Sequence, residues 1–177
     1  MAEKNIALFE KLGVMSKEET LARAEAMHDQ YAGMIEIELK SMIEMVSRQC
    51  IPAVNQAGLS LTLTLALALA LALALALNPH PHPHPHPHPH PKQAGLSDHA
   101  TKLSAGLAEL KAALHAMESA DGSYETAKAA RVARLEVMEK VREVCDAAEA
   151  ATPTALWPIA SYKELLFLDS EQGNTLA

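Results

Sequence analysis

The sequence is poor in aromatic residues and in positive charge, and each shortage narrows what the protein can be. Aromatic residues make up 3% of the 177 positions, so a core has to be built from Ala, Leu, Met and Val, which favours packed helices. Lys and Arg total 15 against 22 Asp and Glu, a net charge of −7. That balance argues against nucleic-acid binding, which rests on neutralising phosphates. The length fits one domain.

Cysteines and targeting signals are equally scarce. Cys50 and Cys145 are the two cysteines, and the N-terminal stretch MAEKNIALFEK has acidic residues where a secretory signal has an apolar run. We therefore expect two reduced, buried thiols and a cytoplasmic protein, with an organelle as the second option.

The familiar catalytic motifs are missing too. There is no Gly-rich phosphate loop, no H-E-x-x-H helix, no CxxC pair and no G-x-S-x-G turn. We predict no catalytic, cofactor-binding or physiological metal site. Glu36 and Glu38 lie in an apolar stretch, and we interpret them as edge positions of a helix with partial ion pairing.

A low-complexity tract interrupts the chain. LTLTLALALALALALAL at 61–77 runs into alternating Pro and His, and the pentapeptide QAGLS stands before the tract at 56–60 and again at 93–97. A tandem CTCACC repeat encodes Leu-Thr in one frame and Pro-His in another, and Leu-Ala differs from Leu-Thr by one base. Our hypothesis is that 61–97 is a translated insertion outside the fold. Spliced transcripts that all keep these codons, with matching peptides, would refute it.

The tract has two other interpretations. The apolar part is just short of the ~20 residues that span a bilayer, and no Lys or Arg flanks it closely, so a membrane role is not expected. The histidines can bind Zn, Ni or Cu incidentally, although alternating Pro keeps them apart on an extended chain. These histidines are His80, His82, His84, His86, His88 and His90.

Two helical segments are expected before the tract. The first ends at Gly13. The second begins with a capping box of Ser16 and Glu19 and runs to about Gln49, where Ile51-Pro52 ends or kinks it. Its expected apolar face comprises Leu21, His28, Tyr31, Ile35, Met42 and Met45, widened by Met34, Ile37 and Val46.

Two more helical segments and a tail follow the tract. One helix carries an apolar seam of Leu103, Leu107, Leu110, Leu114 and Met117, and turns at Asp121-Gly122. The next carries a face of Val137, Val141, Val144 and Ala148, with Met138 and Cys145 beside it, and stops at Pro153. In the tail LWPIASYKELLFL we expect Trp157 to anchor on the helices, with Leu165 and Leu166 facing inward. The structural residues expected there are Trp157, Pro158, Tyr162, Leu165 and Phe167.

The predicted fold is all-α: an antiparallel bundle of three long helices, with a short N-terminal helix and a docked C-terminal tail. Residues 1–60 form the first half of the bundle, 61–97 the insertion, and 98–177 the second half and the tail.

Three collinear stretches resemble a known family. NIALFEKLGVMSKEET, MIEIELKSMIEMVSRQCIPAV and LWPIASYKELLFL are similar to the C-terminal helical domain of type III glutamine synthetases. The chain departs from that pattern at Ala24, where an aromatic residue is common, and at Ala160, where a second Pro is usual.

The resemblance implies a structural and assembly role. In that family, ATP, Mg²⁺ and glutamate bind a catalytic barrel upstream in a longer chain that forms ring oligomers, so no catalytic residue transfers to this sequence. We expect a fragment without cofactors of its own, inactive as a glutamate–ammonia ligase. Its partners would be the catalytic domain and sister subunits, in nitrogen metabolism. The alternatives are a free-standing helical interaction module and a small membrane-anchored protein that uses 61–77.

Overall fold

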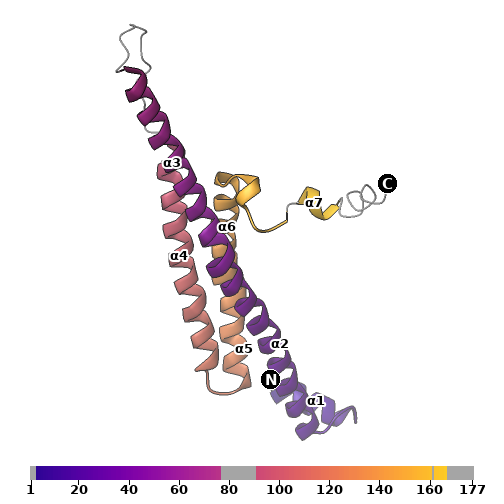
Figure 1. Ribbon diagram of the computed structural model, residues 1–177. Coiled ribbons are helices and arrows are strands. Elements are labelled where there is room, and N and C mark those ends of the chain that lie inside the picture. Colours follow the sequence, from indigo (N-terminus) through magenta and orange to yellow (C-terminus); the bar gives the residue numbers. More distant parts are fainter. Residues whose placement is uncertain (1–2, 77–90, 161, 167–177) are drawn as a thin grey trace.

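The computed structural model describes residues 3–76, 91–160 and 162–166, and every regular element among these residues is helical. The chain runs out along one very long helix, returns along a second and runs out again along a third (Figure 1). The prediction of an all-α protein is confirmed.

The short helix α1 (Glu3–Lys11) ends as predicted at Gly13, which has a positive φ of 64°. The Gly13 N–H donates to the carbonyl of Glu10, and the Val14 N–H donates to the carbonyl of Phe9, each at 3.0 Å. These two bonds make a Schellman motif, in which glycine takes the left-handed position at no steric cost.

Helix α2 (Lys17–Met45) begins with the predicted capping box. The Ser16 Oγ accepts the Glu19 N–H at 3.2 Å, and the Glu19 Oε2 accepts the Ser16 N–H at 2.8 Å. Both bonds satisfy backbone donors that have no partner inside the helix, so this start is encoded locally.

The expectation that this helix ends near Gln49 is wrong. The chain continues through a π-helical segment, η1 (Val46–Cys50), into α3 (Ile51–Ala76). Pro52 lacks an N–H, and its ring crowds the carbonyl four residues earlier. In the π turn the Ile51 N–H reaches back five residues to the carbonyl of Val46, which widens the helix just ahead of the proline.

The return path consists of α4 and a second interrupted helix. Helix α4 (Pro91–Glu118) packs against α3 on one side and against α6 (Glu139–Ala151) on the other. A turn at Gly122, with φ of 86°, leads into α5 (Ser123–Val132), which packs on α2 and continues through π-helical η2 (Ala133–Met138) into α6. The carboxylate of Glu109 on α4 pairs with the Lys140 Nζ on α6 at 2.7 Å.

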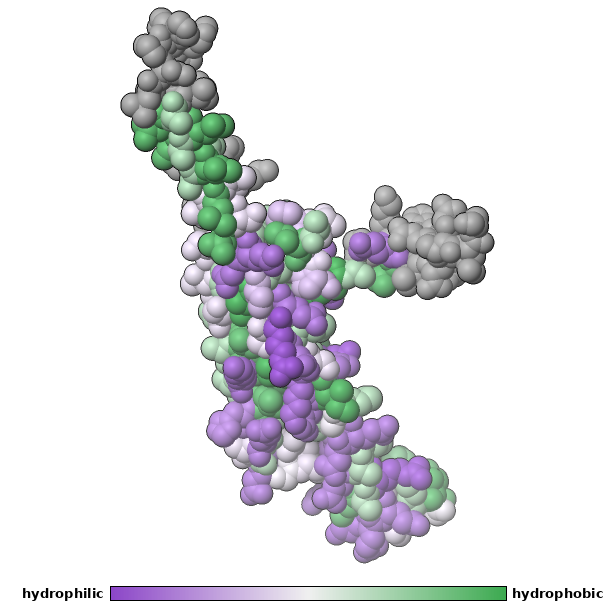
Figure 2. Space-filling model, viewed as in Figure 1, coloured by the Kyte–Doolittle hydropathy of each residue, from purple (hydrophilic) through white to green (hydrophobic). Residues whose placement is uncertain are grey.

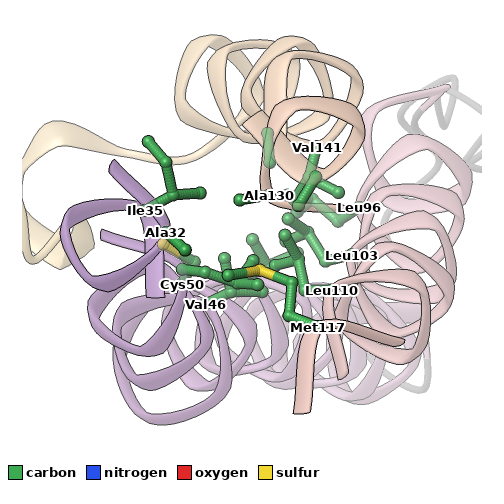
Figure 3. Close-up of a cluster of buried hydrophobic side chains, with 14 of the residues drawn as sticks. Ala32, Ile35, Val46, Cys50, Leu96, Leu103, Leu110, Met117, Ala130 and Val141 are labelled. Carbon is green, nitrogen blue, oxygen red and sulfur yellow. The ribbon is translucent and has the colours of Figure 1, made fainter. Parts of the chain in front are cut away.

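The core lies where the three helical runs face one another (Figure 3). Leu103, Leu110 and Met117 of α4 are buried, and Leu107 and Leu114 pack partly against them, which confirms the predicted seam. Other members of the core are Ile35, Leu39, Val46, Val54, Ala130, Ala133, Val141 and Ala148.

Both ends of the tract reach this core. Leu61 packs partly against it, and Leu96 is only 5% exposed. Beyond Leu61, the outer half of α3 is an apolar helix with exposed side chains, which forms the green upper part of the long helix in Figure 2. Its exposed leucines are Leu63, Leu67, Leu69, Leu71 and Leu73.

Candidate functional site

The residues singled out for incidental metal binding, His80 to His90, lie outside the described part of the chain. Within the described ranges, no group of three or more His, Cys, Asp or Glu residues is placed to hold a metal ion. Among the described residues, the candidates for a functional site are therefore exposed apolar surfaces and grooves.

The tail anchors through its first residues. After the 3-10 turn η3 (Thr154–Leu156), Trp157 lies partly buried against the core, with its Nε1 buried and without a hydrogen-bond partner. Pro158, directly after it, is exposed. The tail then leaves the helices (Figure 1).

The expected inward orientation of the last leucines is wrong. In α7 (Tyr162–Leu166), Leu165 is 55% and Leu166 is 74% exposed. Because both leucines are exposed, they contribute no burial against the core, and five residues alone are too few to form a stable helix. The side chain of Tyr162 and the whole of Phe167 lie outside the described residues.

A set of apolar side chains on α2 faces away from the core. Met45, expected on the buried face, and Met34 and Ile37, expected to widen it, are 40%, 51% and 68% exposed, so these three predictions are wrong. Met27 is 65% exposed. At about 100° per residue these four side chains fall within roughly 80° of one another on the helix. We call Met27, Met34, Ile37 and Met45 the α2 exposed face.

An apolar groove opens at the N-terminal end of that face. It has a volume of ≈ 840 Å³, and Met27 belongs both to its lining and to the α2 exposed face. Ala24, one of the departures from the family pattern, also lines it. The lining residues are Phe9, Met15, Thr20, Arg23, Ala24, Met27, His28 and Tyr124.

One wall of the groove is formed by side chains of α2 and α5 whose rings contact each other at a tilt of 56°. The ring centroids of His28 and Tyr124 are 5.3 Å apart, and the Lys128 Nζ stands 5.1 Å from the centroid of the Tyr124 ring. A hydrogen bond to the Glu125 carboxylate raises the pKa of Lys128, so the ammonium stays charged at neutral pH. No sequence motif pointed to this groove, because its residues come from three helices.

The acidic residues of α2 form ordinary ion pairs. Glu36 pairs with Lys40, a hydrogen bond that raises the pKa of Lys40, and the Glu44 Oε1 lies 2.9 Å from the Arg48 Nη1. Both pairs are exposed and join residues four apart, as the edge interpretation predicts for this stretch. Such pairs contribute little to stability and do not constitute a catalytic site.

One helix contains a stretch that is long and apolar enough, by length and composition alone, to cross a membrane. In the residues that the structure describes, the continuous helix through α2, η1 and α3 contains such a stretch, and that stretch is almost wholly exposed.

The N-terminal part of the chain matches one known family. Residues 1–67 match the family described as glutamine synthetase C-terminal domain, so the resemblance noted in the sequence is confirmed over that part. The match includes α1, α2, η1 and α3 as far as residue 67, and with them the α2 exposed face. No curated protein matches the chain.

Proposed function

We propose that this chain, whose residues 1–67 carry the signature of the glutamine synthetase C-terminal domain, is a structural and assembly domain of such an enzyme. That match is the observation that carries the proposal. The role assigned to the domain is to hold catalytic domains together, and glutamate, ATP and Mg²⁺ would bind elsewhere in the parent enzyme.

The α2 exposed face supports an assembly role. Three methionines and one isoleucine project from a helix whose exposed positions also include the charged residues Glu36, Lys40 and Glu44. Grouped exposed apolar side chains mark sites of protein interaction more often than scattered ones. Methionine side chains are flexible and fill irregular gaps, which suits contact with a partner surface.

The partners that fit are a catalytic domain of the same enzyme class and further copies of the chain. Both would cover the four apolar side chains and close the groove at their end. We place the chain in the same compartment as these partners, the cytoplasm or an organelle. Alone, the chain should form no glutamine.

The test uses the full chain mixed with a type III glutamine synthetase that lacks its own C-terminal domain. We expect association by light scattering, and an Ile37→Lys variant should weaken it by at least about tenfold, because a charge would enter an apolar contact. The matched control is Leu135→Lys, which places the same charge at an apolar side chain that is 56% exposed on η2.

Two results would contradict the proposal. The first is phosphate release from pure chain that depends on glutamate and ammonia. The second is association that the Ile37 and Leu135 variants weaken equally, since the α2 exposed face would then have no special part in it.

A further inference from the structure

The tail carries apolar side chains that do not pack on its own bundle. We call residues 158–160 and 162–166 the tail arm. Three of its aliphatic side chains are exposed, Ile159 at 41%, Leu165 at 55% and Leu166 at 74%. The arm follows Trp157, which packs against the core, and extends away from the helices (Figure 1). Burial of these three side chains against another apolar surface would therefore stabilise the arm.

The groove between α1, α2 and α5 is an apolar surface of suitable size. Phe9, Met15 and Met27 contribute apolar side chains to its lining, and its volume is ≈ 840 Å³. Pockets of about 300–1,000 Å³ hold drug-sized ligands, so the groove has room for a short peptide segment with aliphatic side chains. In Figure 1, α1 lies at the lower end of the long helix, well below the level of α7.

The charges of the arm and of the groove are complementary. Arg23 lines the groove, and among the described residues it takes part in no ion pair. The sequence from residue 158 onward contains the acidic residues Glu164, Asp169 and Glu171 against one basic residue, Lys163. An acidic segment beside an unpaired guanidinium gains a favourable interaction that also fixes its direction.

The arm cannot reach the groove of its own chain. The arm starts beside α3, since η3 packs on that helix. Ala24 in the groove lies 51 − 24 = 27 residues before Ile51, the first residue of α3, which is about 40 Å along the helix axis. From Trp157 to Leu166 the chain spans at most about 25 Å, since the last five residues are helical. An arm that fills a groove must therefore come from another copy.

We propose that the tail arm of one copy of this chain docks in the groove between α1, α2 and α5 of a second copy, with Leu165 and Leu166 against Phe9, Met15 and Met27. The contact joins two different surfaces of the same chain. Such a contact either repeats from copy to copy or is exchanged within a closed assembly.

This inference deepens the proposed assembly function and rests on it for its purpose, because it names the segment and the surface through which copies join. Its test uses the chain alone, without a catalytic domain. Ala24 and Leu166 lie outside the α2 exposed face, so failure of this test leaves the association with a catalytic domain to be decided by the Ile37 variant.

The test measures the mass of the full chain by light scattering over a range of concentrations. The arm variant combines Leu165→Glu with Leu166→Glu, both at exposed side chains. The groove variant is Ala24→Glu, which places a carboxylate in the groove and repels the acidic arm. The matched control is Leu135→Glu, which adds the same charge at a side chain that is 56% exposed on η2. Circular dichroism checks that each variant folds.

We expect the mass of the unaltered chain and of the control to rise with concentration. The arm variant and the groove variant should each remain monomeric up to concentrations at least about tenfold higher. Mixed in equal amounts, they should form pairs that neither forms alone, because the arm variant still has a groove and the groove variant still has an arm. The mixture should stop at pairs, since each pair has used its one intact arm and its one intact groove.

A second variant covers the case in which Ala24→Glu does not fold. Arg23→Glu reverses an exposed charge, so it should weaken association and remove the loss of association that added salt causes in the unaltered chain. A chain that stays monomeric at every concentration would overturn the proposal. So would association that the arm or groove variant retains in full, which would assign it to the exposed leucines of α3 or to another surface. An equal mixture no larger than its two components would overturn it as well.

Discussion

Helices α4 and α6 approach each other closely at Gly106, and one substitution there tests how these two helices pack. An added Cβ would stand 3.0 Å from the Cγ2 of Val141 and 3.3 Å from its Cγ1. Val141 is fully buried, so it cannot swing into solvent to make room. As a β-branched residue in a helix it also has essentially one favoured rotamer.

The expected change in the free energy of unfolding is the difference between two opposing contributions. Replacing Gly by Ala inside a helix stabilises it by about 1 kcal/mol. Crowding an additional methyl group against a buried side chain costs about 1–3 kcal/mol. We therefore expect Gly106→Ala to destabilise the protein by roughly 0–2 kcal/mol. The matched control is Gly33→Ala on α2, where an added Cβ meets nothing within 4 Å, and which should gain about 0.5–1 kcal/mol.

Urea unfolding followed by circular dichroism measures both variants, with equal slopes as the sign that the denatured state is unchanged. Adding Val141→Ala should remove most of the penalty of Gly106→Ala, a coupling that distant sites do not show. If Gly106→Ala stabilises as much as Gly33→Ala does, α4 and α6 do not approach at these residues and the arrangement in Figure 1 is wrong there.

Three further perturbations have expected outcomes. Trp157→Phe should stay within about 1 kcal/mol of the parent in urea unfolding, since it removes a buried Nε1–H that has no partner, whereas Trp157→Ala should cost about 2–3 kcal/mol. Ser16→Ala should cost about 1 kcal/mol and Ser16→Asp should restore it, because the capping oxygen is lost and replaced. Excision of 61–97 should leave a soluble, helical chain that melts cooperatively by circular dichroism, and a non-cooperative melt would mean that the tract belongs to the fold.

The features predicted correctly are those that neighbouring residues determine by themselves. The stop at Gly13 needs only a glycine able to adopt positive φ, and the capping box needs only Ser16 and Glu19 at the right spacing. The apolar seam of α4 could be predicted because residues seven positions apart lie on the same side of a helix, whichever element packs there.

The wrong predictions concern the proline in the long helix and the choice of which apolar face of α2 is buried. The sequence predicts that Ile51-Pro52 ends or kinks the helix, but the helix continues through the π turn of η1, and no sequence rule predicts such a turn. On α2, hydrophobicity alone places Met34 and Ile37 in the core, whereas Ile35, Leu39 and Val46, at three- and four-residue steps along the helix, fill it. A single sequence does not distinguish hydrophobic residues on an exposed face from those in a core.

The repeated pentapeptide QAGLS explains why the tract can be an insertion and still contact the core. Leu59 of the first copy is 62% exposed, while Leu96, its equivalent in the second copy, is 5% exposed. The difference comes from helix phase, since Leu96 precedes Leu103 by seven residues and so joins the seam of α4, and Leu59 lies off the inner side of α3.

Excision leaves one copy of the pentapeptide, and that copy still stands seven residues before Leu103. Its leucine can therefore take the buried place of Leu96. The residues from Asn55 to Gly58 would then form the connection to α4, within the two to eight residues that commonly join packed helices. Asn55 and Gly58 already border the same groove as Leu96 and Ser97, so the two helix ends are near enough to join. The contacts given up are those of Ala57 and Leu61, the last core contacts of α3, whereas the buried seam residues Leu103, Leu110 and Met117 of α4 are all kept.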